Sequence, residues 1–383
     1  MWLYLTIFFF IVLLYVGTIN NPQSKGVLKF VMVFLGIFVG ISDMLGGYDR
    51  YIYGECFDRL VDTMRAGGNI LTTGVVQLYG KEFGYVLLNM AVGLITANRY
   101  VFILIVTLII YTCLYFSFKR HTNNYAFALI LFLGLWFFFS FTYLRQVLAT
   151  SIAWLAIKYV IERDLKRFLL VAFIAASFHN SAILILPLYF IPIKAFKKET
   201  IVIIMGALLL LGLTGGPASL FEVYGSVTED RRIQGNMADI SESGFRMPYL
   251  IEAAFFLFFV LKNYEYITET KEQTVMVNAA LVFCGILLFF VKSENGGRIS
   301  WCYMIGIIST MTYIATRRQR VTDKAIVVIL LCLFLYLRVY NSWQLYLNLY
   351  PYKTFFTDGH REGDYSWQIY EYDHMYDIDK FYR

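Results

Sequence analysis

The chain has 383 residues, of which 59% are hydrophobic and only 16% are charged. A soluble domain carries about 25% charged residues, so the composition excludes an ordinary soluble protein. The net charge of +6 comes from short basic clusters between apolar runs, which argues against a nucleic-acid partner and is typical of cytoplasmic loops in a membrane protein.

Apolar runs long enough for transmembrane helices recur along the whole chain and predict an all-α, polytopic integral membrane protein. The expected spans are 1–19, 27–44, 99–118, 124–143, 145–162, 165–178, 181–193, 200–214, 247–262, 274–291, 299–316 and 324–341. The pair 165–178 and 181–193 is too short for two comfortable crossings, so a tight hairpin or a broken helix is expected there, and the total is about 10–12 spans. The first run lacks a basic n-region and a cleavage site, which predicts a retained span.

Lys and Arg cluster at turns that would all lie on one side of the membrane. These turns hold Lys25 with Lys29, the stretches 119–121, 162–167, 194–198 and 317–320, and Lys262 with Lys271. The positive-inside rule puts this side in the cytoplasm. The polar segments 45–98 and 215–246 are then expected outside, with an interfacial helix at 83–95.

The domain organisation expected from this pattern is one polytopic transmembrane domain over 1–349. The remaining tail, 350–383, is rich in Tyr, Trp, Asp and Glu. It is too polar for lipid and too aromatic for a disordered segment, so we expect a small extracytoplasmic cap.

Neither the cysteines nor the histidines predict a metal or a disulfide framework. Four of the five cysteines lie within apolar runs, and the four histidines are scattered. No CxxC pair or metal-ligand spacing occurs, so no metal and no cofactor is expected.

Arg145 lies near the middle of the apolar stretch "LWFFFSFTYLRQVLATSIAWLAI", residues 135–157. Burying a guanidinium in lipid costs about 3 kcal/mol or more, and arginine does not lose its charge to escape that cost. Two explanations are open. Arg145 lies at a turn and extends to the headgroups, or it faces a wet cavity and binds an anion.

Arg298, in "SENGGRISW", is expected at the same outer level as Arg145. Arginine binds diphosphate oxygens through two parallel hydrogen bonds, so two arginines facing one cavity suit a lipid diphosphate. The two glycines before Arg298 allow a close backbone approach, and Arg145 lies near a helix N-terminus, which favours anions. The alternative is that both side chains are anchors at helix ends.

The stretch "GGYDRYIYGECFD", residues 46–58, mixes carboxylates with tyrosines directly after a span. Sugar sites use this mixture, because aromatic rings stack on pyranose faces while carboxylates accept from hydroxyls. Asp49 is therefore a candidate for acceptor binding or general-base work, and Tyr48, Tyr51 and Tyr53 are candidates for glycan stacking. An amphipathic interfacial segment with a tyrosine belt is the alternative.

His179, in "FHNSAILILPL" at 178–188, is expected at a membrane turn. A lone histidine there is most often a structural hydrogen-bonding residue. Beside Asn180 and Ser181, a neutral imidazole could instead donate to a phosphate or take a proton from a hydroxyl.

These motifs together resemble the EpsG family, which belongs with the Wzy-type polysaccharide polymerases. The ordered set is "GYDRY" after the second span, "R-x-x-x-A" from Arg145 to Ala149, "FHNSA", a late "GGRIS" and a terminal "YPYK". The resemblance covers nearly the whole chain and implies a GT-C-like membrane glycosyltransferase. It implies roles for Asp49 and His179 as catalytic residues and for Arg145 and Arg298 in diphosphate binding.

The implied reaction joins oligosaccharide repeat units carried on undecaprenyl diphosphate, at the outer face of the bacterial inner membrane. The products would be exopolysaccharide, capsule or O-antigen, and the expected partners are membrane lipid and a chain-length regulator protein. A diphosphate leaving group needs charge stabilisation more than protonation, so the arginines would replace a metal ion. A flippase for lipid-linked oligosaccharide, a ligase with another acceptor and an O-acyltransferase remain as alternatives.

Overall fold

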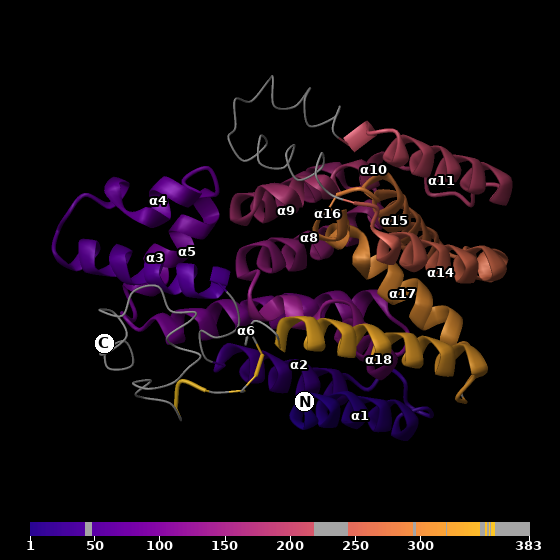
Figure 1. Cartoon of the computed structure of the whole chain (residues 1–383), viewed down its shortest axis with the longest axis horizontal. Coiled ribbons are helices and arrows are strands. Elements are labelled where there is room, and N and C mark those ends of the chain that lie inside the picture. The colour runs from indigo at the N-terminus through magenta and orange to yellow at the C-terminus, as the bar shows by residue number, and fades with distance from the viewer. Residues whose placement is uncertain are drawn as a thin grey trace. The chain divides into compact units, whose positions relative to one another are not determined.

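A computed structural model of the chain describes residues 1–42, 48–217, 244–293, 296–318, 320–344, 349–350, 352 and 354–356. Over these ranges the chain is helical, and the extended pairing is confined to one backbone bridge between Ser42 and Thr354 (Figure 1). The predicted all-α fold class is confirmed.

The first part of the chain contains long helices separated by short ones. They are α1 (Trp2–Gly17), α2 (Lys25–Gly40), α3 (Tyr48–Arg65), η2 (Ile70–Thr72), α4 (Gly74–Tyr79), α5 (Phe83–Gly93), α6 (Arg99–His121), α7 (Tyr125–Leu135), η3 (Phe137–Phe141), α8 (Leu144–Glu162) and α9 (Leu165–Phe178). The helix expected at 83–95 is therefore present as α5.

The second part continues in the same way. Its helices are η4 (Asn180–Ile185), α10 (Pro187–Phe190), α11 (Lys198–Leu213), α14 (Met247–Asn263), η5 (Tyr264–Ile267), α15 (Lys271–Phe289), α16 (Gly296–Ser300), η6 (Trp301–Tyr303), α17 (Met304–Ala315) and α18 (Asp323–Gln344).

Four helices of the described chain are long and apolar enough to cross a membrane. They are Arg99–His121, Leu144–Glu162, Lys271–Phe289 and Asp323–Trp343. Shorter apolar helices include Trp2–Gly17 and Tyr125–Leu135. These helices support a polytopic membrane protein, as the composition predicts.

The expected pair 165–178 and 181–193 forms a tight hairpin, because the chain turns back after α9 and places the Tyr189 ring 5.1 Å from the ring of Phe168, near the start of that helix. α9 ends at Phe178, and the chain continues as a 3₁₀ turn and the single-turn helix α10. Pro187 occupies the first turn of α10, where its missing N–H is tolerated, and Pro192 follows soon after its end. Of the two possibilities raised by the short apolar runs, the structure has the first, because a helix that only breaks after Phe178 would carry Tyr189 away from Phe168.

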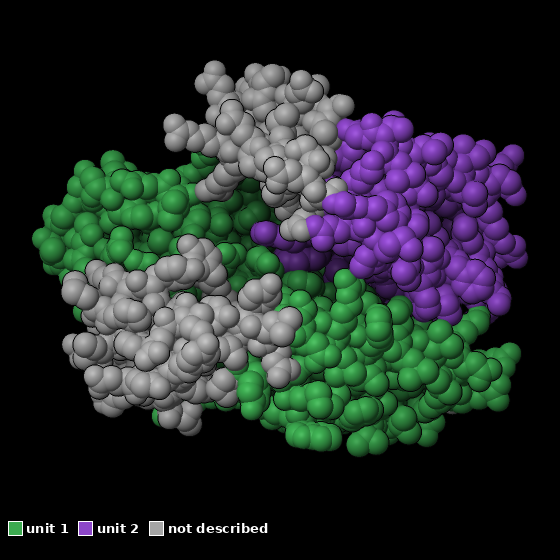
Figure 2. All heavy atoms as spheres, viewed as in Figure 1, with its two compact units in different colours: residues 1–156, 169–183, 318–383 green, residues 157–168, 184–317 purple. Residues whose placement is uncertain are grey.

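The described residues group into two compact units (Figure 2). Unit 1 comprises 1–156, 169–183 and 318–383, and unit 2 comprises 157–168 and 184–317. In unit 1, α2 packs along α6, α1 and α18 pack on α7, and α3 packs on α5 and α6. In unit 2, α15 is the central helix and packs against α11, α14 and α17.

Arg50, the arginine of "GYDRY", is fully buried in unit 1 and stabilises the end of a helix. Its Nη2 donates to the carbonyls of Val39 at 2.9 Å and Ser42 at 2.8 Å, and its Nη1 donates to Phe141 at 3.1 Å. Burial lowers the pKa of Arg50 to about 10, which leaves it charged at neutral pH. The side chain therefore neutralises carbonyls at the C-terminus of α2, a structural role.

The "YPYK" motif lies over the same helix end. The Tyr352 hydroxyl donates to the Phe38 carbonyl at 2.7 Å, and the two rings stack at 4.3 Å. Phe355 N–H donates to the Ile41 carbonyl at 3.2 Å. The start of the predicted cap is thus fixed to α2, whereas residues 357–383 lie outside the described residues.

Candidate active site

Arg145 and Glu82 form a buried ion pair in unit 1. Arg145 is the second residue of α8, and Glu82 is the residue that precedes α5. Nη1 of Arg145 donates to Oε2 of Glu82, and the two side chains are 11% and 3% exposed. Removing one partner of such a pair costs about 3–5 kcal/mol, because the other charge stays buried without compensation.

Three tyrosine rings surround the guanidinium of Arg145. Its central carbon lies 3.8 Å from the ring centroid of Tyr79, 5.4 Å from that of Tyr53 and 5.7 Å from that of Tyr85. The faces of these rings attract a cation. Nε of Arg145 is buried and has no hydrogen-bond partner among the described residues. We call Arg145, Glu82 and the three tyrosines the tyrosine cage.

The second oxygen of Glu82 reaches a different helix end. Oε1 accepts a hydrogen bond of 3.2 Å from the backbone N–H of Asn180, just after α9. Glu82 thereby joins the start of α8 to the turn that contains His179. The close approach depends on Gly84, since a Cβ atom there would lie 2.2 Å from Oγ and 3.1 Å from the carbonyl oxygen of Ser177.

Replacing Gly84 by alanine is expected to separate α5 from α9 and to destabilise the protein by about 1–3 kcal/mol, the usual range for overpacking. Thermal unfolding of the purified protein in detergent measures the effect. Adding Ser177→Ala should restore part of the loss, because it removes the nearest atom. Gly26→Ala is the control, since a Cβ at Gly26 meets nothing within 4 Å. Equal stability of the two single variants would contradict the expected contact.

His179 directly follows α9 and is oriented by its own turn. Its Nδ1 accepts from the backbone N–H of Ser181 at 3.2 Å and lies 2.8 Å from the Ser181 hydroxyl. A ring nitrogen that accepts carries no proton, so the neutral ring has its proton on Nε2. In this tautomer Nε2 is a hydrogen-bond donor, which suits contact with an anion better than proton abstraction.

Asp49 lies in the first turn of α3 and is half-buried. Burial raises the pKa of the Tyr79 phenol; the Arg145 charge lowers it, and the charge of Asp49 adds to the rise. Asp49 lies one helical turn before Tyr53 on α3, so both are on the same face of this helix and Asp49 is next to the tyrosine cage. Unit 1 thus brings together Asp49, Arg145 and His179.

The tyrosines predicted for glycan stacking are largely enclosed. Tyr51 is 2% exposed and lies against Arg99, which forms a buried ion pair with Asp58. Tyr53 is 4% exposed and belongs to the cage. The side chain of Tyr48 lies outside the described part. Stacking of a glycan on these rings stays a prediction and requires that they become accessible.

Arg298 is half-buried on α16, in unit 2. Arg145, by contrast, belongs to unit 1. Its pairing with Arg145 at one diphosphate therefore stays a prediction.

Comparison with known protein families matches residues 27–354 to the EpsG family. The chain belongs to the EpsG family. No curated protein and no solved structure matches it. The family and the apolar helices identify a membrane polysaccharide polymerase of the glycosyltransferase type in general terms. The resemblance seen in the ordered motifs is confirmed.

Sequence reasoning missed three residues of this EpsG-family site: Glu82, Tyr79 and Tyr85. A usable signal was present in "LYGKEFGYV", residues 78–86, where a carboxylate lies three residues from a tyrosine on either side. This is the mixture that identified 46–58, but here the neighbouring apolar residues predicted only an interfacial helix.

Proposed function

We propose that this EpsG-family protein joins oligosaccharide repeat units carried on undecaprenyl diphosphate, at the outer face of the inner membrane. A hydroxyl of the acceptor unit attacks the anomeric carbon of the donor chain. A new glycosidic C–O bond forms, the C–O bond to the diphosphate breaks, and undecaprenyl diphosphate leaves. The hydroxyl proton passes to a base on the protein.

The tyrosine cage is the observation that supports this proposal. The guanidinium is bonded by Glu82 through Nη1 and lies over the ring of Tyr79, while Nε has no hydrogen-bond partner among the described residues. A cation fixed in this way before the substrate binds can stabilise the charge that develops on a leaving diphosphate without reorganising. It can therefore do the work of a metal ion in a metal-independent, Wzy-type reaction.

The other residues take roles that follow from their surroundings. His179, with its proton on Nε2, donates to a diphosphate oxygen. Asp49 is a carboxylate near the cage and takes the acceptor proton. Arg298 supplies a second cation to the diphosphate.

The side of the membrane proposed for the site follows from the positions of the basic turns. Lys and Arg concentrate in the connections expected in the cytoplasm, whereas Asp49, Arg145 and His179 belong to the opposite ends of their segments. Lipid-linked repeat units delivered to the outer leaflet would meet the site from that side.

The test uses purified protein in proteoliposomes with a synthetic undecaprenyl-diphosphate-linked repeat unit. We expect a ladder of glycan lengths together with release of undecaprenyl diphosphate in equal amount to the bonds formed. If the protein moves the lipid-linked unit between leaflets and forms no glycosidic bond, it is a flippase. Transfer of an acyl group instead of a sugar would identify an O-acyltransferase.

A further inference from the structure

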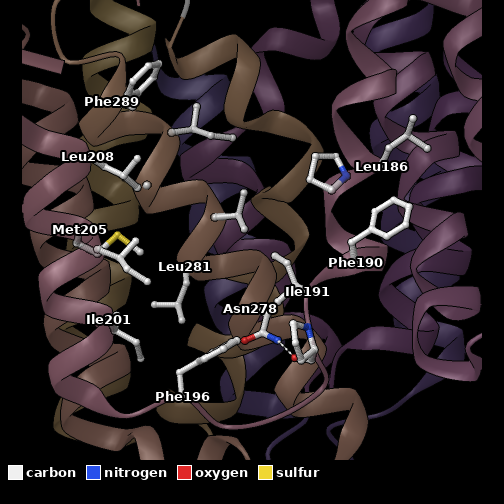
Figure 3. A pocket seen from close by; sticks show the side chains of 16 residues that line it. Leu186, Phe190, Ile191, Phe196, Ile201, Met205, Leu208, Asn278, Leu281 and Phe289 are labelled. Atoms are coloured by element: carbon white, nitrogen blue, oxygen red, sulfur yellow. Dashed lines mark hydrogen bonds between the residues drawn. The ribbon is translucent and has the colours of Figure 1, made fainter. Parts of the chain in front are cut away.

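Unit 2 contains a large apolar pocket that the reaction chemistry does not use. Its volume is about 910 Å³, near the upper end of the range of about 300–1,000 Å³ found for ligand pockets. One wall comes from α11, a second from α15, and a third from the segment 186–196 in the returning arm of the hairpin after α9. In Figure 3 Leu186 and Phe190 stand opposite Met205 and Leu208 across the space.

The pocket is elongated along α15. Its lining on this helix runs from Asn278 to Phe289, which corresponds to about 16 Å at 1.5 Å per residue. Phe196 and Phe289 lie towards its opposite ends in Figure 3. A space that is long and narrow fits a linear hydrocarbon chain better than a compact ligand.

The chemistry of the lining excludes a charged ligand group. None of the lining residues is charged, and the single amide among them, Asn278, donates to the Pro192 carbonyl at 3.1 Å. A charged headgroup would therefore meet no side chain of opposite charge here. The walls carry branched aliphatic side chains and proline rings, which present an uneven surface.

We infer that this pocket binds part of the polyprenyl chain of the lipid carrier. The inference rests on the proposed function, which supplies a substrate with a long, methyl-branched, unsaturated hydrocarbon. Within a bilayer the hydrophobic effect gives no preference for protein over lipid, so selectivity comes from the fit of the two surfaces. An uneven slot lined by branched side chains fits a methyl-branched chain better than a smooth acyl chain.

The face of α11 that points away from the pocket provides a matched control. Ile203 is 71% exposed, whereas Met205, two residues further, lines the pocket. Tryptophan at position 205 should fill part of the space, and tryptophan at 203 should enter the lipid. Both variants introduce a tryptophan into α11, so they differ only in the face of the helix that carries it.

The probe is a diazirine-bearing polyprenyl phosphate in proteoliposomes, with the labelled peptides mapped after irradiation. We expect labelling of α11 and α15 at the pocket and competition by undecaprenyl phosphate. Met205→Trp should reduce this labelling about tenfold, because part of the chain loses its contacts, and Ile203→Trp should leave it unchanged. Leu208→Phe is a milder second variant, and unfolding temperatures show that each protein is folded.

The labelling results test the pocket and the proposed function separately. Equal competition by phosphatidylglycerol would identify the pocket as a site for ordinary bilayer lipid and overturn the inference. Unchanged labelling in folded Met205→Trp and Leu208→Phe proteins would overturn it as well. The readout needs no glycosyl transfer, so specific labelling without polymerisation would refute the proposed function alone, and polymerisation without labelling would refute the pocket alone.

Discussion

Arg145→Lys is expected to abolish polymerisation, although it keeps the positive charge. The central carbon of the Arg145 guanidinium lies 3.8 Å from the centroid of the Tyr79 ring, while its Nη1 donates to Glu82. A lysine ammonium is a point charge without a planar fork, so it cannot bond Glu82, lie on the ring and donate to a diphosphate at once. We expect a loss of about 10²–10³ in rate, as for the removal of one preorganised donor to a developing negative charge.

Initial rates with purified variants measure this loss, and unfolding temperatures separate it from a folding defect. Arg59→Lys is the matched control, because Arg59 makes an exposed ion pair with Glu55 on α3. Such surface pairs contribute about 0–1 kcal/mol, so this variant should keep full activity. If Arg145→Lys also polymerises at the wild-type rate, Arg145 serves only to pair with the buried Glu82 and not in the reaction.

The helices were predictable from sequence because the bilayer imposes one dominant constraint. A chain in lipid satisfies its backbone groups within helices, so apolar runs and helices coincide. The expected spans 145–162 and 247–262 correspond to α8, Leu144–Glu162, and α14, Met247–Asn263. The expected span 124–143 is divided into α7 and η3, since a 3₁₀ turn changes the backbone geometry without changing hydrophobicity.

The site was predictable only in part, because its contacts join residues far apart in the chain. Position at the end of an apolar run identified Arg145, which belongs to the tyrosine cage, and His179, whose turn Glu82 contacts. The partner of Arg145 was not predictable, since Glu82 is 63 residues away and is brought there by the packing of α5 on α9.

Charge alone also does not separate the different surroundings of Arg50 and Arg145. Arg50 and Arg145 both follow apolar runs on the expected outer side, and both are largely buried. The four described acceptors of Arg50 are backbone carbonyls, whereas Arg145 pairs with a carboxylate and lies against aromatic rings. Only these partners distinguish the helix cap made by Arg50 from the buried ion pair made by Arg145.

Asp49→Asn is expected to slow turnover by about 10²–10⁴, the usual contribution of a general base, while donor binding stays intact. A sugar hydroxyl is a weak nucleophile, and the amide cannot accept its proton. His179→Ala should instead weaken donor binding by about 10–100-fold, as for one hydrogen bond to a charged group. The reason is that the Nδ1 contacts of His179 leave the proton on Nε2, where it can donate to the diphosphate.

Donor binding and single-turnover transfer, measured separately on purified proteins, distinguish the two roles. Asp62→Asn is the control for Asp49→Asn, because Asp62 lies on the same helix about 20 Å further along α3. Normal turnover in Asp49→Asn would remove Asp49 from catalysis. Weaker donor binding in that variant, combined with normal binding in His179→Ala, would mean that the carboxylate contacts the donor and that the two roles are exchanged.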